Sequence, residues 1–269
     1  NLQNIPVRTR DGREIRAAFV PGFPGWQLLC ADYSQIELRV LAHFSEDQAL
    51  RQAFEDDRDI HAQVASEIYG VELAEVTAEM RRAAKAVNFG IIYGQSPFGL
   101  AKALSIDKRE AAAFIEAYFE RYPAVDRFMD EILENCRSHG YVATALGRRR
   151  LIQGVREPAL RRDTRQRNLP ERIAINTVIQ GSAADLIKQA MLRVYHRLRN
   201  QELQARLLLQ IHDELIFEMP AVEQYDLARL AVEEMSAVGD LSIPLKVDVK
   251  VGGNWAECEP MSPDSIRGD

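Results

Sequence analysis

The stretch LLLQIHDELIFEM, residues 207–219, constrains the fold more than any other part of the chain. It is an apolar run of the kind that forms a buried strand pair, and His212, Asp213 and Glu214 interrupt it. Successive side chains of a strand point to opposite faces, so no simple register exposes all three to water. The run therefore predicts a core hairpin whose turn carries an imidazole and two carboxylates. Taken alone, such a turn is more often solvated surface than a functional site.

A further carboxylate, Asp32, ends the apolar run WQLLCA. Behind it, Ile36, Val40 and Phe44 recur at helical spacing, so Asp32 lies where a strand gives way to a helix. Half-buried carboxylates cost several kcal/mol unless they are neutralised. Mg²⁺ neutralises them while taking only one or two protein carboxylates. Two such ions roughly 4 Å apart could activate an attacking hydroxyl and stabilise a leaving oxygen. Asp32 and Asp213 are therefore the candidate metal ligands.

The order of expected elements indicates an α+β fold. Residues 1–31, including REIRAAFV, are expected to be strands and turns, and SIPLKVDVKVG alternates like a strand with one wet face. Between them, Asp59 and Thr77 can cap helices, a strand pair is expected within 141–152, and a long helix within 171–199. Strands, many helices, then strands again predict an antiparallel sheet with a helical insertion.

Composition and charge exclude little. The hydrophobic fraction of 46% is typical of a soluble globular protein, and no apolar run is long enough to span a bilayer. The cysteines are three and lie scattered, which predicts neither a disulfide framework nor a zinc site. The net charge of −6 argues mildly against a nucleic-acid binder, but nine arginines face three acidic residues between Gly147 and Arg172. The plainer interpretation of that basic block is a solvated loop.

Two stripes at a spacing of four residues are candidate binding surfaces. The first is cationic at one end and aromatic at the other, which matches the phosphates and the base of a nucleoside triphosphate. The alternative is a helix whose aromatic residues pack into the core. The second stripe consists of polar side chains that are long enough to reach phosphates or minor-groove acceptors. The alternative is an ordinary polar helix surface. The stripes comprise Arg81, Lys85, Phe89 and Tyr93, and Arg172, Asn176 and Gln180.

Several segments together resemble one known family, the family A DNA polymerases. They occur in the family's order as NLQNIPVRT (1–9), DYSQIELR (32–39), RRAAKAVNFGIIYG (81–94), GRRR (147–150), INTVIQGSAADLIKQAM (175–191) and QIHDELIFE (210–218). The resemblance implies a right-hand polymerase fold lacking the thumb. Its palm would be residues 1–40 and 171–257, its mostly helical fingers residues 41–170, and residues 258–269 would be a disordered tail.

The resemblance also implies roles for single residues. Asp32, Asp213 and the Tyr33 backbone carbonyl would hold two Mg²⁺ ions, with Mn²⁺ as an alternative. Glu214 would lie close by in the catalytic site, and Lys85 would be the general acid for the departing pyrophosphate. Glu37 would be the steric gate against a ribose 2′-hydroxyl. The deoxynucleotide site would comprise Arg81, Lys85, Phe89, Tyr93, Gln35, Glu37 and His61. Contacts to primer–template DNA would come from Arg8, Arg148, Arg172, Asn176, Gln180 and His212.

The expected function is thus template-directed DNA synthesis from deoxynucleoside triphosphates by a monomer, without a membrane, in the bacterial cytoplasm near the nucleoid. A fragment that only binds primer–template DNA or nucleotide is the alternative, because the thumb is not expected here. A two-metal nuclease would explain Asp32 and Asp213 but neither the stripe beginning at Arg81 nor Glu37. A related RNA polymerase fits Glu37 less well.

Overall fold

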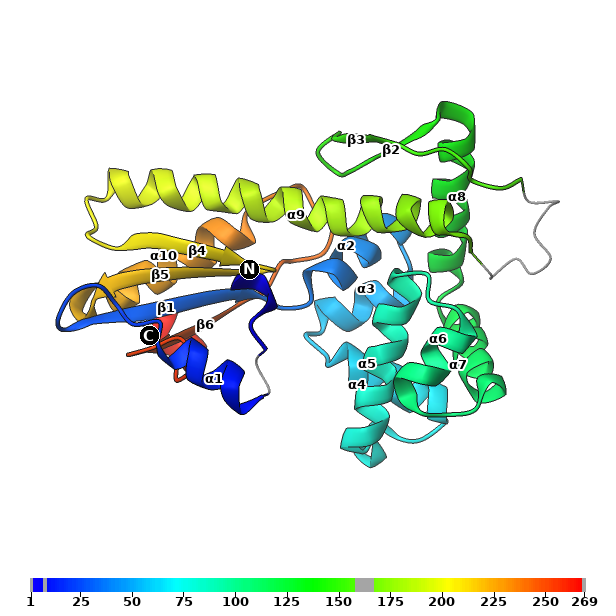
Figure 1. The fold of residues 1–269 in the computed structure, drawn as a ribbon, viewed down its shortest axis with the longest axis horizontal. Helices are drawn as coiled ribbons and strands as arrows, with labels where there is room; N and C mark the ends of the chain where they lie inside the picture. Colours follow the sequence, from blue (N-terminus) through cyan, green and yellow to red (C-terminus); the bar gives the residue numbers. More distant parts are fainter. Residues whose placement is uncertain (1, 7–8, 158–166, 268–269) are drawn as a thin grey trace. The chain divides into compact units, whose positions relative to one another are not determined.

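The fold is seen in a computed structural model that describes residues 2–6, 9–157 and 167–267 (Figure 1). The chain divides into two compact units. The sheet unit comprises Asn1–Ile36, Leu186–Asp240 and Leu245–Asp269, and the helical unit comprises Glu37–Asp185 and Leu241–Pro244. Along the described part of the chain, no helix has the length and apolar character needed to cross a bilayer. The expected α+β class is confirmed.

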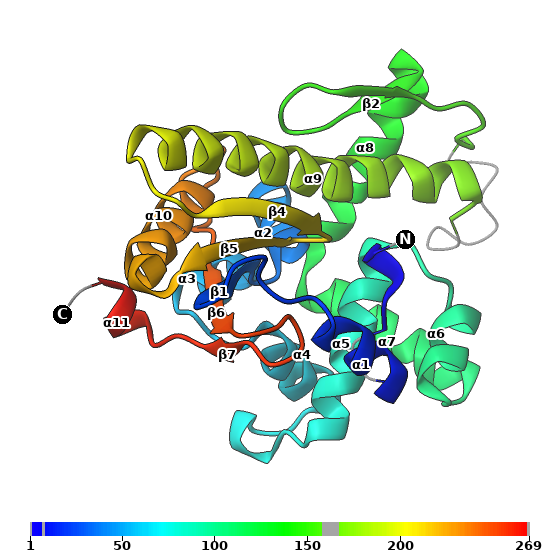
Figure 2. The same ribbon diagram turned by 60° about the vertical axis from the view of Figure 1, so that its left-hand side comes forward.

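The described residues of the sheet unit form a five-stranded antiparallel sheet in the order β4-β5-β1-β6-β7 (Figures 1 and 2). The central strand comes from the start of the chain and its neighbours from the last third. Asp32 in β1 stands opposite Glu214 in β5 and Asp248 in β6. The strands are β1 (Trp26–Tyr33), β4 (Arg206–Ile211), β5 (Glu214–Pro220), β6 (Val247–Gly252) and β7 (Glu259–Pro260).

The two faces of this sheet are covered differently. Helix α10 (Gln224–Ser236) packs on β1 and β6, and the Tyr33 hydroxyl donates to the Met235 carbonyl oxygen of α10 at 2.7 Å. The other face carries the core cluster of Leu28, Cys30, Ile211, Ile216 and Trp255. Because residues two apart in a strand share a face, Asp32 continues the row of Leu28 and Cys30 on this second face.

Two expectations for the ends of the sheet unit are wrong. The segment around REIRAAFV begins as helix α1 (Arg10–Ala17), because the Thr9 hydroxyl accepts from the Gly12 amide at 3.1 Å and caps it. The tail after residue 257 was expected to be disordered. Instead β7 pairs with β6, the Met261 amide donates to the Val249 carbonyl oxygen at 2.9 Å, and α11 (Pro263–Arg267) follows. Backbone bonds to a sheet edge leave no signal in side-chain composition.

The helical unit begins with helices whose ends match the sequence signals. The side chains of Asp59 and Thr77 accept backbone amides at the starts of α4 and α5, and Gly70 ends α4 at a φ of +64°. Pro123 stands at the start of α8, where its missing amide hydrogen costs no helical hydrogen bond. The helices are α2 (Ile36–Ser45, beginning in the sheet unit), α3 (Gln48–Glu55), α4 (Ile60–Tyr69), α5 (Ala78–Ile92), α6 (Pro97–Leu104), α7 (Lys108–Arg121) and α8 (Pro123–His139).

A hairpin and a long helix complete the helical unit. Strands β2 (Tyr141–Ala143) and β3 (Arg149–Leu151) pair, as predicted. Helix α9 (Leu169–Asn200) belongs to the helical unit up to Asp185 and to the sheet unit beyond it. Short 3-10 turns lie at η1 (Leu2–Asn4), η2 (Leu73–Glu75) and η4 (Ala221–Glu223). The structural units thus divide at Ile36 and Asp185, whereas the expected palm and fingers boundaries at 40 and 170 stay a prediction.

Candidate active site

The carboxylates singled out in the sequence converge in the sheet unit. The pKa of Asp32 is raised to about 7, first by burial and then by the negative charges of Asp213 and Glu214. Lys250 lowers it in part. The three acids are therefore close enough for their charges to repel one another in a half-buried place. A cation bound among them would relieve that repulsion.

Hard oxygen donors of this kind fit Mg²⁺. Within the described residues, no group of three or more His, Cys, Asp or Glu side chains has the arrangement of a metal-binding cluster. Mg²⁺ needs no such cluster, since it takes one or two carboxylates and completes its shell with water and substrate phosphates. The residues present thus fit the expected ion, with Asp32 and Asp213 as the candidate ligands.

The hairpin explains how polar residues interrupt an apolar run. Ile211 pairs with Glu214, so His212 and Asp213 form a two-residue turn. His212 has a φ of +53° and is exposed, while the flanking strands carry the core. The Tyr33 amide donates to the Asp213 carbonyl oxygen at 3.1 Å, which ties the end of β1 to this turn. The turn is therefore placed beside Asp32 by backbone bonding as well as by register.

Glu214 and His212 each have a described partner near this turn. The indole Nε1 of Trp255 donates to Glu214 Oε2 at 3.4 Å, and a His212 ring nitrogen lies 3.0 Å from the Gln3 carbonyl oxygen. Gln35 follows β1 with a φ of +57°, a backbone conformation that residues with a Cβ seldom adopt. Arg8 lies outside the described residues.

The cationic and aromatic stripe lies along one side of α5 in the helical unit. Arg81, Lys85 and Tyr93 are exposed and Phe89 is half-buried, while Val87 and its neighbours face the core. The Phe89 and Tyr93 rings stack with centroids 6.0 Å apart, and Lys85 Nζ lies 5.8 Å from the Phe89 centroid. Neither aromatic ring is fully buried, so the stripe lies on the accessible side of the helix.

Asp59 holds the first cation of the stripe. Arg81 Nε donates to Asp59 Oδ2 at 2.6 Å, while Oδ1 of the same carboxylate accepts from the His61 and Ala62 amides. Burial raises the pKa of the Asp59 carboxyl, but the hydrogen bond from Arg81 and the bonds from the backbone outweigh it, so the pKa lies below its usual value. One carboxylate thus starts α4 and orients the guanidinium on α5.

His61 is buried, with 3% of its surface exposed. Its Nδ1 lies 2.9 Å from Asn88 Nδ2, and an amide nitrogen can only donate, so Nδ1 is the acceptor and the ring is neutral. The pKa of His61 is lowered to about 4, first by burial and then by the positive charge of Lys85. The Phe89 ring lies 6.1 Å away. His61 is therefore an uncharged, buried group that lies beside Phe89 of the stripe.

The expected steric gate is bonded to the end of the stripe. The Tyr93 hydroxyl donates to Glu37 Oε2 at 3.2 Å. Both residues belong to the helical unit. Glu37 is half-buried, so a fixed carboxylate stands beside the aromatic end of α5.

A basic groove lies between the β2–β3 hairpin and the first half of α9. It has a volume of about 560 Å³. Arg172 Nε, on the same helix, and Asn176 Oδ1 are buried polar atoms for which the described residues offer no hydrogen-bond partner. Such atoms are costly unless a ligand satisfies them. The groove is lined by Thr144, Arg148, Arg149, Arg150, Ile173, Asn176, Thr177, Gln180 and Gly181.

The tip of the hairpin is fastened to α9 by Asp185. This carboxylate is 4% exposed and accepts from the Thr144 hydroxyl at 2.6 Å and from Arg148 Nε at 2.8 Å. The Ala145 amide donates to the Ser182 hydroxyl at 2.8 Å. Arg148 itself is 63% exposed in its side chain. Asp185 thus orients the Arg148 guanidinium, whose other side is exposed to solvent and open to a ligand.

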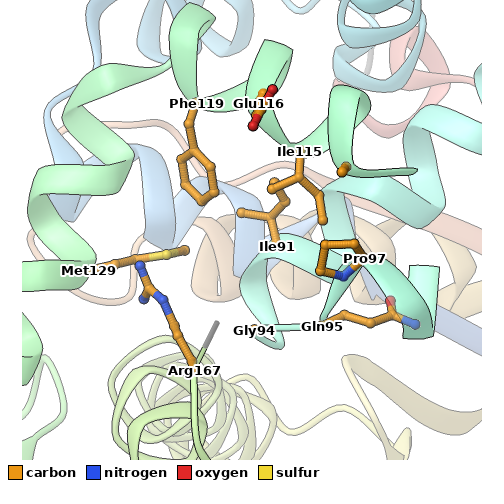
Figure 3. A pocket seen from close by; sticks show the side chains of 10 residues that line it. Ile91, Gly94, Gln95, Pro97, Ile115, Glu116, Phe119, Met129 and Arg167 are labelled. Carbon is orange, nitrogen blue, oxygen red and sulfur yellow. The ribbon is translucent and has the colours of Figure 1, made fainter. Parts of the chain in front are cut away.

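A separate small cavity lies at the end of α5 (Figure 3). It measures about 90 Å³, and Ile91, Ile115, Phe119 and Met129 supply apolar walls. The Arg167 guanidinium lines it and pairs with Asp126 at 3.6 Å. None of the expected site residues lines this cavity, so it is not the candidate active site.

Comparison with known proteins decides the family. The family model described as DNA polymerase family A matches residues 1–257. The chain belongs to DNA polymerase family A. This confirms the resemblance carried by the motifs.

Relatives within family A are close in sequence and fold. DNA polymerase I of Bacillus caldotenax is 52% identical over 259 residues, covering 96% of this chain and 29% of that protein. DNA polymerase I of Bacillus subtilis (strain 168) is 48% identical over 259 residues, with the same coverage. The POL domain of Pol1 from M. smegmatis, in complex with DNA primer-template and dNTP, has a TM-score of 0.87 at 44% identity and covers 95% of this chain and 44% of that chain. The chain thus spans 29% of the length of these curated relatives.

Sequence reasoning missed the residues that hold the family A motif side chains in place. Asp59 was expected as a helix cap but not as the partner of Arg81. Asn88 and Asp185 are polar residues on otherwise buried helix faces, a pattern that could have singled them out. Thr144 and Trp255 carry no comparable signal, because their partners are distant in sequence.

Proposed function

We propose that this chain carries the nucleotidyl-transfer site of a DNA-directed DNA polymerase, which adds deoxynucleotides to a primer 3′-hydroxyl and releases pyrophosphate. The sheet unit would be the palm and the helical unit the fingers. The observation that carries the proposal is the accessible side of α5, where two cations precede two stacked aromatic rings. A nuclease that shared the carboxylates would have no use for such a surface.

The sheet unit would supply the charge for the reaction. Asp32, Asp213 and the Tyr33 carbonyl would hold two Mg²⁺ ions, or Mn²⁺ in their place. When bound, these cations lower the cost of charge on the attacking hydroxyl and on the leaving pyrophosphate. Glu214, fixed by the Trp255 indole, would keep the site negative enough to retain them.

The helical unit would bind the incoming nucleotide. Arg81 and Lys85 present guanidinium and ammonium groups to phosphate oxygens, and Lys85 would donate a proton to the departing pyrophosphate. Phe89 and Tyr93 offer a flat surface to the base and sugar. The carboxylate of Glu37, held by the Tyr93 hydroxyl, would exclude a ribose 2′-hydroxyl. Gln35 and the neutral His61 complete the expected nucleotide set.

The basic groove would follow the DNA backbone and minor groove. Arg148 is exposed for a phosphate, while the unsatisfied Arg172 Nε and Asn176 Oδ1 suit a donor–acceptor contact with DNA. Gln180 lies one turn further along α9, and Arg8 and His212 would contribute from the sheet unit. A monomer near the bacterial nucleoid is the setting we propose for this activity.

Primer extension tests the function. Wild-type chain would be incubated with a labelled primer–template, Mg²⁺ and deoxynucleotides at low salt, beside Asp213→Asn and the matched surface variant Asp240→Asn. Asp240 is exposed, so its substitution makes the same charge change away from the site. We expect templated extension by wild type and Asp240→Asn, none by Asp213→Asn, and weak use of ribonucleotides that Glu37→Ala improves.

The result also separates the alternatives. Relatives are far longer, so a chain that binds DNA without extending the primer is the second candidate. Binding of primer–template and nucleotide with no extension by any variant would support that candidate. Shortening of the primer that depends on Asp213 would contradict the polymerase proposal and favour a nuclease.

A further inference from the structure

Two cysteines meet on the sheet face that carries Asp32. The sulfur atoms of Cys30 and Cys258 are 3.8 Å apart, although the residues are 228 positions apart in sequence. Cys30 is 2% exposed in the middle of β1, and Cys258, just before β7, is half-buried. Both belong to the sheet unit. The third cysteine, Cys136, is 1% exposed in α8 of the helical unit.

Gly252 is what allows the two sulfurs to meet. It pairs with Leu28, so a side chain at residue 252 would point to the face of Leu28 and Cys30. A Cβ built there would lie 2.7 Å from the Glu257 carbonyl oxygen and 2.8 Å from the Cys258 Cα. The segment 257–258 therefore crosses over β6 in the space that a side chain would fill, and this crossing carries Cys258 to Cys30.

We propose that Cys30 and Cys258 form a redox-active dithiol that small organic disulfides oxidise to an intramolecular disulfide. The Cys258 thiolate attacks one sulfur of RSSR, forms a mixed disulfide and releases RS⁻. The Cys30 sulfur, losing its proton, then displaces the second RS⁻ and closes the Cys30–Cys258 bond. In sum, two protein thiols and one RSSR give one protein disulfide and two RSH.

The order of attack follows from the surroundings. Cys258 is the more accessible sulfur, and the Cys30 thiol donates to it at 3.8 Å. That hydrogen bond lowers the pKa of Cys258, which favours its thiolate as the first nucleophile. Cys30 sits behind it as the resolving thiol. A disulfide needs about 2.05 Å between the sulfurs, so closure requires rotation of both side chains and movement of the 254–258 turn.

Oxidation of Cys30 and Cys258 would restrain the sheet face that carries Asp32. The turn that holds Cys258 also holds Trp255, whose indole donates to Glu214. The Cys258 thiol itself donates to the Asn254 carbonyl oxygen at 3.2 Å, so the turn is short and internally bonded. Closing the bond joins this turn to β1 two residues before Asp32. The disulfide thereby restrains the Trp255–Glu214 contact.

The test is intact-mass and thiol analysis of the native chain. Reduced protein would be incubated with excess oxidised glutathione and then quenched with acid. We expect wild type to lose two of its three thiols and two hydrogen atoms of mass, at a rate independent of protein concentration. Cys136→Ser is the matched control and should close in the same way. Cys30→Ala should stop at a glutathione adduct on Cys258, and Cys258→Ser should keep both remaining thiols.

A second measurement does not depend on the variants folding equally well. Closing so long a loop constrains the unfolded chain, so wild type and Cys136→Ser should melt several degrees higher when oxidised. Addition of dithiothreitol should return the melting temperature to that of the reduced chain. The proposal is overturned if wild type keeps three thiols, if it stops at a mixed disulfide, or if its disulfides link separate chains.

Discussion

Replacing Asp185 by asparagine tests how the tip of the β2–β3 hairpin is held. The variant keeps the shape of the side chain but removes its charge. It also replaces one acceptor oxygen by an NH₂ group, which then faces either the Thr144 hydroxyl or Arg148. The hairpin tip should open more often, because its main attachment to α9 is weakened.

The magnitude follows from the exposure of each partner. The bond from Thr144 is buried, and loss of a hydrogen bond to a charged group costs about 1.5 kcal/mol or more. The pair with Arg148 is worth less, about 0.5 kcal/mol, because that guanidinium is 63% exposed and solvent screens it. We therefore expect local opening of the hairpin to become easier by about 2 kcal/mol, or about 30-fold in its equilibrium constant.

Hydrogen exchange of single amides measures this opening directly. The Ala145 amide, bonded to Ser182, and the Arg148 amide, bonded to Thr144 Oγ1, should exchange about 30-fold faster in Asp185→Asn. The Gly140 amide, bonded to Cys136 in α8, should not change. Arg148→Met in both backgrounds isolates the coupling between the acid and the guanidinium.

Two results would refute this reasoning. The first is protection of the Ala145 and Arg148 amides that stays within about twofold of wild type, which would place the attachment elsewhere. The second is an Arg148→Met effect that is equal with and without Asp185, because then the two side chains do not share one interaction.

Three further predictions concern pH, backbone strain and metal. Burial lowers the pKa of His61 from 6.5 to about 4. The neutral ring therefore contributes fully to the free energy of unfolding above pH 6.5, and this contribution is lost as the pH falls toward 4. Thermal melts should show wild type losing up to about 3 kcal/mol of that free energy across this window, and His61→Gln losing less. Gly94→Ala should lower the melting temperature more than Gly140→Ala. Both glycines have positive φ, but only at Gly94 would a Cβ lie 2.7 Å from Arg172 Cγ. Chelation of divalent ions should abolish primer extension, and added Mg²⁺ should restore it.

Local signals made much of the fold predictable. Asp59 and Thr77 cap helices through their own side chains, so a few residues suffice to find those helix starts. The hairpin turn at His212 and Asp213 was visible because polar residues interrupt an apolar run. Helix α1 is the exception among these short-range signals, because its apolar residues suggest a strand although Thr9 provides a helix cap.

Contacts between distant residues were not predictable from the sequence. The motif positions gave the identities of Arg81 and Arg148, but their partners Asp59 and Asp185 lie 22 and 37 residues away and follow no local pattern. The pairing of β7 with β6 depends on backbone bonds at a sheet edge. What local patterns leave out is therefore the set of groups that hold the site residues in position.

The strand order has a consequence for synthesis of the chain. Leu28 in the central strand pairs with Glu218 and Gly252, roughly 190 and 220 residues later. At about 5–20 residues per second, a ribosome needs on the order of ten seconds or more to make that stretch. Meanwhile the apolar Leu28–Ala31 segment has no strand partner, whereas nearly all of the helical unit emerges as one continuous piece. Misfolding of the nascent protein should therefore begin at β1, and a chaperone that shields short apolar strands should raise the yield of folded protein.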